Sequence, residues 1–414
     1  MLPVLSRIYT PSDFEYLAIF ISILSIISVF ACLKYEMAIP VSKSDREARE
    51  LLRLCFELAA IVAIISGLAL YMISFSIERI EGLWVWIVIG SFLIGIYNAL
   101  SYYYVKNKEF IILSKNRVLQ SAVGNAVQFS GVAFPGSIFT LVAGHVLKGG
   151  GGALGLAYLF ISRRWLRTRI VWSNKKRKLL MLKYANFPRY TLVESLANTA
   201  GLQLPILAIA LLQGGGESGY LLMAMQLLAA PVTLIGGAVS QVYLSHAAEK
   251  KSNLDLKAYT EEVCGNLLRY GFGPILFIGI CSPFLMPKLL GNDWVRTGEI
   301  ALWICPWMAM RFVSSPISMV MHIRGQQKSL MVLTVAGFFI RFGVVAFWAL
   351  FREHQYTEVY ALSSFTFYVL CFFWFLGTAG LSIRDILKLF DKSFFLVFFI
   401  CVAAGGTVFA MGGL

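Results

Sequence analysis

The sequence contains few charged residues for its length. Of its 414 residues, 14% are Asp, Glu, Lys or Arg, whereas 58% are hydrophobic. In a soluble globular domain roughly a quarter of the residues are charged, so this chain has too few charges to cover a water-facing surface. The composition excludes an ordinary soluble domain and predicts that a lipid bilayer surrounds most of the side chains.

The usual signatures of an enzyme or a metalloprotein are missing as well. The seven cysteines lie in apolar segments without metal-ligand spacing, so we interpret them as small buried hydrophobic residues. The four histidines lack a Cys, His or carboxylate partner at ligand spacing, and no glycine-rich phosphate loop follows a strand. The loops leave no room for a soluble catalytic domain. We therefore expect a protein that is not an enzyme and that has no metal or cofactor.

What the chain does have is long apolar runs. A membrane-spanning helix needs about 20 apolar residues, whereas a spanning β-strand needs about ten alternating ones. The runs in this sequence have the helical length and do not alternate. We predict an all-α polytopic membrane protein with about twelve transmembrane helices. The expected spans lie near 12–33, 52–74, 82–105, 115–135, 138–161, 191–212, 217–245, 263–288, 297–322, 328–350, 356–381 and 391–412.

The basic residues indicate the orientation of the chain. Arg163 to Arg189 is rich in Lys and Arg and contains no acid, which marks a cytoplasmic loop. Alternation of the spans then puts the basic clusters at 34–53, 106–117, 250–257, 324–328 and 384–392 on the same side. We expect the Arg163–Arg189 stretch to lie on anionic membrane lipids, with a docking site for a cytoplasmic partner as the alternative. Topology accounts for the net charge of +14, so nucleic-acid binding is not expected.

A short repeat predicts two lobes. Asp13–Leu17 and Glu217–Leu221 each place an acid three residues before a Tyr-Leu pair at the start of a span. Repeats on this scale are common in transporters, with a chance match as the alternative. Because alternation leaves Met1 on the outer face, we expect the first lobe to lack its first helix. The predicted parts are an N-terminal lobe at 1–170, a basic linker at 171–190, a C-terminal lobe at 191–385 and an extra transmembrane helix at 386–414.

Polar side chains recur at helical spacing inside several spans. Arg311, Ser314, Ser315, Ser318 and His322, for example, follow steps of three and four. Small and hydroxyl residues in such stripes also serve helix packing, which is the alternative for the Gly and Ser positions. A charge deep in a span costs about 2.5–3.5 kcal/mol on insertion scales, so it usually faces a cavity or a partner.

The charges in these stripes are mostly positive. Glu57 and Glu194 are the only acids away from the outer ends of the spans, and the basic residues outnumber them. A positive, partly dehydrated cavity suits a phosphate or a diphosphate, whereas pairing with these two acids is the structural alternative. The candidate substrate-binding residues from the stripes are Arg311, Arg341, His145, Lys148, Glu194, Asn198, Gln226, Gln241, Asn98 and Asn125.

Four stretches of the sequence carry a family resemblance. They are Leu5–Phe14, Leu33–Ile39, Asn186–Tyr190 with Gln203–Pro205, and Ala230–Tyr243. With the span pattern, they resemble the Wzx-type lipid-linked oligosaccharide flippases, whose superfamily includes the multidrug and toxin extruders and the lipid II flippases. The resemblance adds Lys34 and Glu36 to the candidate substrate-binding residues. The family usually has Arg where Lys34 stands; Lys keeps the charge and loses the bidentate fork.

The resemblance implies a two-lobed, V-shaped bundle around a central cavity. Its substrate would be an undecaprenyl-diphosphate-linked oligosaccharide that crosses the bacterial inner membrane for synthesis of O-antigen lipopolysaccharide, capsule or exopolysaccharide. The polysaccharide polymerase machinery would be a further partner. Two alternatives stay open. The excess of Arg over acid argues against a cation-coupled multidrug exporter, and the absence of a large outer loop argues against a membrane glycan polymerase or ligase.

Overall fold

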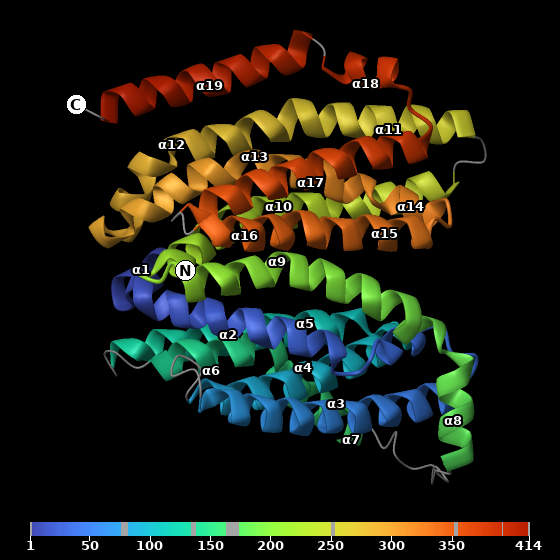
Figure 1. The fold of residues 1–414 in the computed structure, drawn as a ribbon. Coiled ribbons are helices and arrows are strands. Elements are labelled where there is room, and N and C mark those ends of the chain that lie inside the picture. The colour runs from blue at the N-terminus through green and yellow to red at the C-terminus, as the bar shows by residue number, and fades with distance from the viewer. Residues whose placement is uncertain are drawn as a thin grey trace. The chain divides into compact units, whose positions relative to one another are not determined.

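The fold consists of helices joined by short connections (Figure 1). The computed structural model describes residues 2–75, 82–133, 138–162, 174–249, 253–351, 355–390 and 392–412. No strand occurs in these ranges. The predicted all-α class is therefore confirmed. Part of the basic segment, residues 163–173, lies outside the described part of the chain.

Most of the expected spans form long apolar helices. In the described residues, eight helices are long and apolar enough to cross a membrane. They are Pro11–Phe30, Asp45–Ser74, Leu83–Lys106, Phe187–Leu212, Asp255–Leu290, Asn292–Ile323, Gln327–Phe351 and Tyr356–Ala379. Shorter apolar helices occupy Ile138–Gly150, Gly152–Ser162 and Phe394–Thr407. The chain is thus a multi-pass membrane protein.

The chain folds into two compact units. Unit 1 contains Tyr16–Gln203, and unit 2 contains Leu2–Glu15 with Leu204–Leu414. This boundary differs from the expected one, because it lies inside the helix α9 (Leu192–Leu212) rather than in the basic linker. Leu2–Glu15 also belongs to the second unit rather than to an N-terminal lobe.

Specific contacts account for the position of the chain start. The Ser6 hydroxyl donates to the Leu290 carbonyl at 3.0 Å, and the Trp294 indole donates to the Ser6 carbonyl at 3.1 Å. The ring of Phe14 meets the ring of Trp294 edge-on at 5.2 Å. The two buried hydrogen bonds and the ring contact hold α1 (Leu2–Ile8) and the start of α2 (Pro11–Phe30) in unit 2.

Unit 1 is built around the pair α3 (Asp45–Ser74) and α4 (Leu83–Lys106). Two further helices, α5 (Phe110–Phe129) and α6 (Ile138–Gly150), pack closely against each other. A run of four glycines interrupts the helix here: α6 ends at Gly150 and α7 (Gly152–Ser162) begins at Gly152, with a turn at Gly151. The basic helix α8 (Asn174–Lys183) precedes α9.

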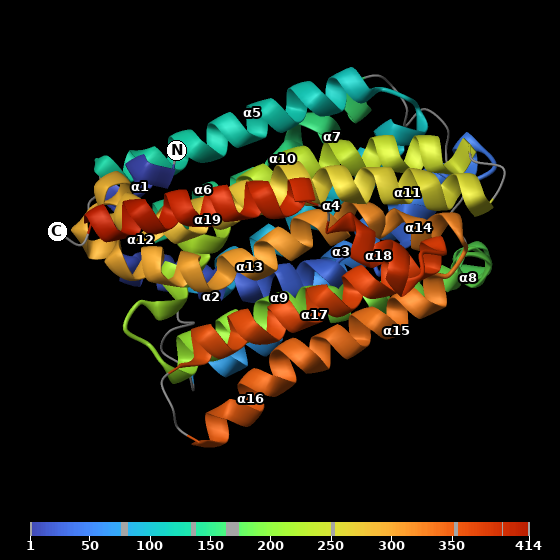
Figure 2. The ribbon, with the colours of Figure 1, turned by 90° about the horizontal axis from the view of Figure 1, so that it is seen from above.

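Unit 2 is organised around α13 (Val295–Ile317), whose neighbours are α10 (Glu217–Glu249), α12 (Gly273–Leu290) and α17 (Tyr356–Ala379). Its terminal helix α19 (Lys392–Gly412) runs along α12 in both ribbon views (Figure 2). The remaining helices are α11 (Asn253–Leu267), α14 (Met319–Ile323), α15 (Gln327–Phe338), α16 (Val344–Trp348) and α18 (Ile383–Leu389).

Candidate functional site

Arg341 is a buried charge inside unit 2. It lies in a π-helical turn, η7 (Phe339–Gly343), that joins α15 to α16, and its side chain is fully buried. Its Nε donates to the Gly337 carbonyl at 3.0 Å, and its guanidinium carbon lies 4.4 Å from the centre of the Phe367 ring. The two terminal nitrogens have no hydrogen-bond partner in the described part of the chain. The face of an aromatic ring, rather than an acid, therefore balances this cation.

The packing around Arg341 depends on a glycine. A Cβ added at Gly337 would lie 2.6 Å from Cδ2 of Phe367, which is closer than real contacts allow. Gly337 thus lets the Phe367 ring approach the helix and cover the guanidinium. Gly337 and Arg341 lie one helical turn apart, so the space at the glycine admits the ring that covers the arginine.

Arg311, the second intramembrane arginine, is more accessible than Arg341. It is half-buried on α13, and Ser315 and His322 further along the same face are exposed. Arg311 forms no hydrogen bond or ion pair with a side chain that the structure describes. The charges of Arg311 and Arg341 both act on the hydroxyl of Tyr360, a fully buried residue of α17. Two cations therefore lie near one point of unit 2.

The serines of the α13 stripe differ in their surroundings. Ser314 is buried and donates to the carbonyls of Met310 at 2.7 Å and Tyr368 at 3.3 Å. It therefore packs α13 against α17, which agrees with the helix-packing interpretation. Ser315 is exposed and Ser318 is half-buried, so these two remain on the side of Arg311.

Lys148 and His145 occupy the α5–α6 pair of unit 1. The Lys148 amine donates to Oε1 of the buried Gln128, and the Gln128 amide donates to the Leu141 carbonyl at 3.1 Å. The His145 ring meets the Phe20 ring edge-on at 6.2 Å. Neither contact supplies a negative charge. Gln128 was not among the predicted site residues, although it shares the polar stripe of α5.

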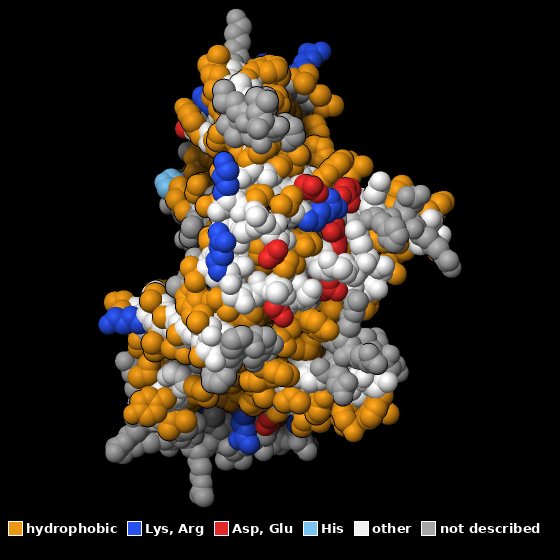
Figure 3. Space-filling model, turned by 90° about the vertical axis from the view of Figure 1, so that its left-hand side faces the viewer, with side chains coloured by type: hydrophobic (Ala, Val, Ile, Leu, Met, Phe, Trp, Pro, Cys, Tyr) orange, Lys and Arg blue, Asp and Glu red, His pale blue; other side chains and the backbone are white. Residues whose placement is uncertain are grey.

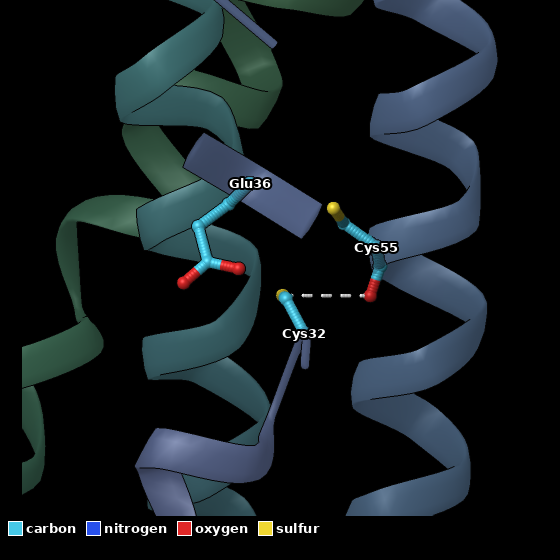
Figure 4. Close-up of side chains that lie close together, drawn as sticks. All are labelled: Cys32, Glu36 and Cys55. Atoms are coloured by element: carbon cyan, nitrogen blue, oxygen red, sulfur yellow. Dashed lines mark hydrogen bonds between the residues drawn. The ribbon is translucent and has the colours of Figure 1, made fainter. Parts of the chain in front are cut away.

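Lys34 and Glu36 lie in the turn between α2 and α3. Lys34 has a left-handed backbone with φ of 64° and is half-buried, and the following turn η1 (Tyr35–Ala38) buries Glu36. Burial raises the pKa of the Glu36 carboxyl, while a backbone hydrogen bond and the Lys34 charge lower it. The structure also brings Cys32 and Cys55 to Glu36 (Figure 4). No sequence pattern indicates this approach, because the two cysteines are separated by a turn and part of a helix.

The other predicted site residues are distributed over both units. Glu194 is half-buried and Asn198 is exposed, both on the part of α9 in unit 1. Asn98 on α4 and Asn125 on α5 are half-buried in unit 1. Gln226 is half-buried on α10 of unit 2, and the side chain of Gln241 lies outside the described residues.

One charged cluster was missed. Arg296 at the start of α13 donates to Glu217 Oε1 at 2.9 Å, to Glu358 Oε1 at 2.6 Å and to Glu299 Oε2 at 2.9 Å. The Thr357 hydroxyl also donates to Glu217 at 2.9 Å. Acidic and basic side chains gather in this way at the helix ends seen in Figure 3. The cluster joins α10, α13 and α17. In the sequence these residues appear only as separate charges near the ends of spans, which do not predict that they meet.

Unit 2 also contains an apolar hollow of about 450 Å³. Its walls come from α10, α11, α12 and α13 and include Ile235, Val239, Leu267, Tyr270, Ile275 and Phe312. None of the described residues that line it is charged. The hollow therefore has the apolar character that suits a hydrocarbon chain.

Comparison with known proteins agrees with these features. A family model described as "Polysaccharide biosynthesis protein" matches residues 4–298. The fold is similar to that of the lipid II flippase MurJ in its inward closed conformation, with a TM-score of 0.72 and 12% identity over 100% of this chain and 96% of that one. It is also similar to an inward-facing multidrug resistance MATE family transporter of the MOP superfamily, with a TM-score of 0.69 and 13% identity over 92% of this chain and 94% of that one. No curated protein sequence matches the chain.

Proposed function

Since the chain belongs to the polysaccharide biosynthesis protein family, we propose that it is a flippase for an undecaprenyl-diphosphate-linked oligosaccharide. Its fold is that of membrane flippases and transporters rather than that of an enzyme. The lipid-linked glycan would move from the cytoplasmic to the periplasmic leaflet of a bacterial inner membrane. O-antigen, capsule or exopolysaccharide synthesis would consume it, with the polymerase machinery as the partner that receives it.

The pair Arg311 and Arg341 is the observation that carries this proposal. Both arginines act on Tyr360 inside a membrane unit, and neither forms an ion pair with a described carboxylate. An unpaired guanidinium in a low-dielectric site attracts an anion strongly, and its planar fork matches phosphate oxygens. A diphosphate would supply the missing counter-charge.

The two arginines receive different roles in the proposal. Arg311 is half-buried and has free donors, so it would contact the diphosphate directly. Arg341 is fully covered and lies against Phe367, so in this conformation it would act through its field as a positioning residue. Direct contact with Arg341 would require the Phe367 ring to move.

Unit 1 would supply further cations and the polar groups for sugar. Lys148 and His145 would assist with the phosphate charge, since neither contacts a carboxylate among the described residues. Amide and carboxylate side chains would bind sugar hydroxyls. We propose Lys34, Glu36, Glu194, Asn198, Gln226, Gln241, Asn98 and Asn125 for these contacts.

Replacement of Arg311 tests the proposal. Loss of a charge-assisted hydrogen bond removes about 1.5–3 kcal/mol, which corresponds to an about 10–150-fold loss of transport in Arg311→Ala. Arg311→Lys should restore part of it. Export would be measured as surface polysaccharide per unit of membrane-inserted protein, in a flippase-null strain that assembles a defined glycan. The exposed Arg46, which pairs only with Glu50, provides the control Arg46→Ala.

The same strains distinguish the rival function. An exporter for cationic drugs should gain activity when Arg311 becomes neutral, because a positive site repels its substrate. Normal glycan export by Arg311→Ala, combined with increased dye efflux, would contradict the flippase proposal.

A further inference from the structure

Three potential metal ligands converge in unit 1. The Sγ atoms of Cys32 and Cys55 and a carboxylate oxygen of Glu36 all lie within 4.8 Å of one another, and all three residues are buried (Figure 4). Each comes from a different element: the turn after α2, the helix α3, and the turn η1. Both cysteines are free thiols.

The backbone that produces this convergence is strained. Leu33 and Lys34 have φ of 48° and 64°, both in the left-handed region. Such a conformation costs of order 1–3 kcal/mol for a residue other than glycine, and it persists only where the surroundings impose it. The consecutive left-handed pair reverses the chain within two residues and turns Cys32 and Glu36 toward the same point.

One oxygen of the Glu36 carboxylate lacks a hydrogen-bond partner in the described part of the chain. Its Oε2 atom is buried and receives no hydrogen bond in the described part of the chain, and Glu36 as a whole is 5% exposed. An unsatisfied buried carboxylate oxygen costs several kcal/mol unless it is protonated or bound to a cation. Lys34 acts on Glu36 from a distance but forms no hydrogen bond with it.

The thiols are held only weakly in the metal-free arrangement. Cys32 donates to the carbonyls of Cys55 at 3.6 Å and Gly95 at 3.4 Å. Sulfur is a poor hydrogen-bond donor, so these contacts can be given up at little cost. In a tetrahedral zinc site with Zn–S of about 2.3 Å, two sulfurs lie about 3.8 Å apart, so the ligands need to move by only about 1 Å.

We propose that Cys32, Glu36 and Cys55 bind one zinc-class divalent cation. Two thiolates select a borderline-soft metal such as zinc over calcium or magnesium, which prefer oxygen ligands. Binding forms two Zn–S bonds and one Zn–O bond, and it releases the two thiol protons to solvent. Three protein ligands leave the fourth position for a water molecule. The inference does not rest on the proposed transport function, and a bound cation would take Glu36 out of the sugar contacts proposed above.

The metal would join three elements. Cys32 lies two residues after the end of α2, Glu36 belongs to η1 and Cys55 lies about three turns after the start of α3. A cation at this position would lock the turn that bears Lys34. The expected effect of zinc is therefore a higher melting temperature of the protein.

The test uses the full chain in detergent, reduced, stripped with a chelator and freed of any affinity tag. We expect about one zinc per chain, two or more protons released per zinc, and tighter binding at higher pH. Cobalt in place of zinc should give the near-ultraviolet absorption of thiolate ligation. Cys32→Ser, Cys55→Ser and Glu36→Gln should each weaken zinc at least about 100-fold, beyond the effect of losing a supporting group.

Cys264→Ser is the matched control, since Cys264 is as fully buried as Cys55 and has no neighbouring ligand. It should bind zinc like the unaltered chain. Glu36→Gln keeps the shape of the site and remains informative if a serine variant fails to fold. Absence of zinc and of any zinc-dependent rise in melting temperature in the unaltered reduced chain would overturn the proposal. So would a Cys32–Cys55 disulfide, detected as two thiols that alkylate only after reduction.

Discussion

Arg341 shows how a single residue can be conspicuous in the sequence while its surroundings are not. Its place in the middle of an apolar run predicted a functional charge. The sequence could not show that the side chain turns inward, because that depends on the π-helical turn η7 and on the space left by Gly337. A one-residue shift in helical phase decides whether a side chain faces its neighbours or the outside.

Replacing Arg341 by methionine separates function from stability. Arg341 has no acid partner in the described part of the chain, so an apolar residue of similar length should leave stability unchanged or raise it by about 1–4 kcal/mol. Transport should fall because the local positive field is lost. Thermal unfolding and glycan export of Arg341→Met would be measured on the same protein preparation.

Arg296→Met provides the contrasting case. Arg296 bridges three carboxylates, and its removal leaves Glu217, which is 6% exposed, without its cation. Because the Arg296 side chain is 31% exposed, we discount the full cost of breaking a buried pair and expect a loss of about 2 kcal/mol. Equal destabilisation by Arg341→Met would mean that Arg341 is a structural charge.

The serines and cysteines mark the limit of inference from spacing alone. Steps of three and four placed Ser314 and Ser315 on one stripe, yet one packs against α17 and the other is exposed. Cys32 and Cys55 were correctly interpreted as buried residues. Their approach to Glu36 arises from the left-handed turn at Leu33 and Lys34. Residue preferences do not predict this turn, because neither residue is a glycine.

At the scale of elements, close helix approach depends on particular glycines. Gly124 of α5 and Gly144 of α6 face each other, and a Cβ at Gly144 would lie 2.6 Å from the Gly124 carbonyl oxygen. Small residues that let backbones approach in this way are common at the interfaces between membrane helices. Helical spacing alone leaves open whether a glycine in a polar stripe serves packing or polar contacts, and the structure assigns Gly124 to packing.

Gly144→Ala should therefore separate α5 from α6. The obstacle is a backbone carbonyl, which cannot rotate away, so we expect a loss of more than about 2 kcal/mol of stability. The control is Gly237→Ala in α10, where a Cβ would meet nothing within 4 Å. That change should be neutral or stabilising by up to about 1 kcal/mol, because alanine favours helix. Equal melting temperatures for the two variants would contradict the close contact.

The short helix α18 is fastened to α11 by one ion pair. Lys257 Nζ lies 2.6 Å from Asp385 Oδ2, and Asp385 also completes a capping box with Ser382. The hydrogen bond from Lys257, followed by those from Ser382, holds the pKa of Asp385 well below its usual range. A pKa lowered in the folded state means that stability is present above the unfolded value of about 3.9 and is lost as the pH falls below it.

Asp385→Asn should lower the melting temperature by the same amount from pH 5 to pH 8. The difference from the unaltered chain should shrink only below about pH 4, where the carboxylate of the unfolded chain begins to bind a proton while the native one is still ionised. Differential scanning fluorimetry over this range measures it. Glu262→Gln, an exposed acid of the same α11 helix without an ion pair in the described residues, should change nothing. A difference that grows on acidification would show the wrong sign for the coupling.

At the scale of the whole molecule, hydropathy predicted the class of fold well and the division of the chain poorly. Long apolar runs necessarily become helices in a bilayer, because every backbone polar group must be satisfied within its own segment. The unit boundary in α9 depends instead on tertiary contacts. Trp294 and Phe14 hold the chain start in unit 2, and no local pattern encodes a pairing across 280 residues.

The contacts between loops support the predicted sidedness of the chain. In unit 1, Lys106 donates to the Ser42 carbonyl at 2.7 Å and Lys183 pairs with Glu47, which joins segments assigned to the cytoplasm. In unit 2, the Lys257–Asp385 pair does the same.

The opposite helix ends are joined separately. Ser6 bonds with Trp294, and Arg296 bonds with Glu217 and Glu358, all in segments that alternation assigns to the outer side. In the described part of the chain, each of these contacts joins segments that are assigned to the same side of the membrane. They agree with alternation whatever the placement of the two units.

Cysteine labelling in intact cells decides the orientation. Lys178 on α8 and Glu299 on α13 are both exposed, whereas six of the seven native cysteines are buried and Cys401 is half-buried. Because basic loops are retained in the cytoplasm, an impermeant maleimide should label Glu299→Cys from outside and should reach Lys178→Cys only after permeabilisation. Cys401→Ser in the background removes the remaining native thiol of intermediate exposure. Labelling of Lys178→Cys from outside would reverse the topology, and it would also reverse the direction in which the arginines of unit 2 could carry a phosphate.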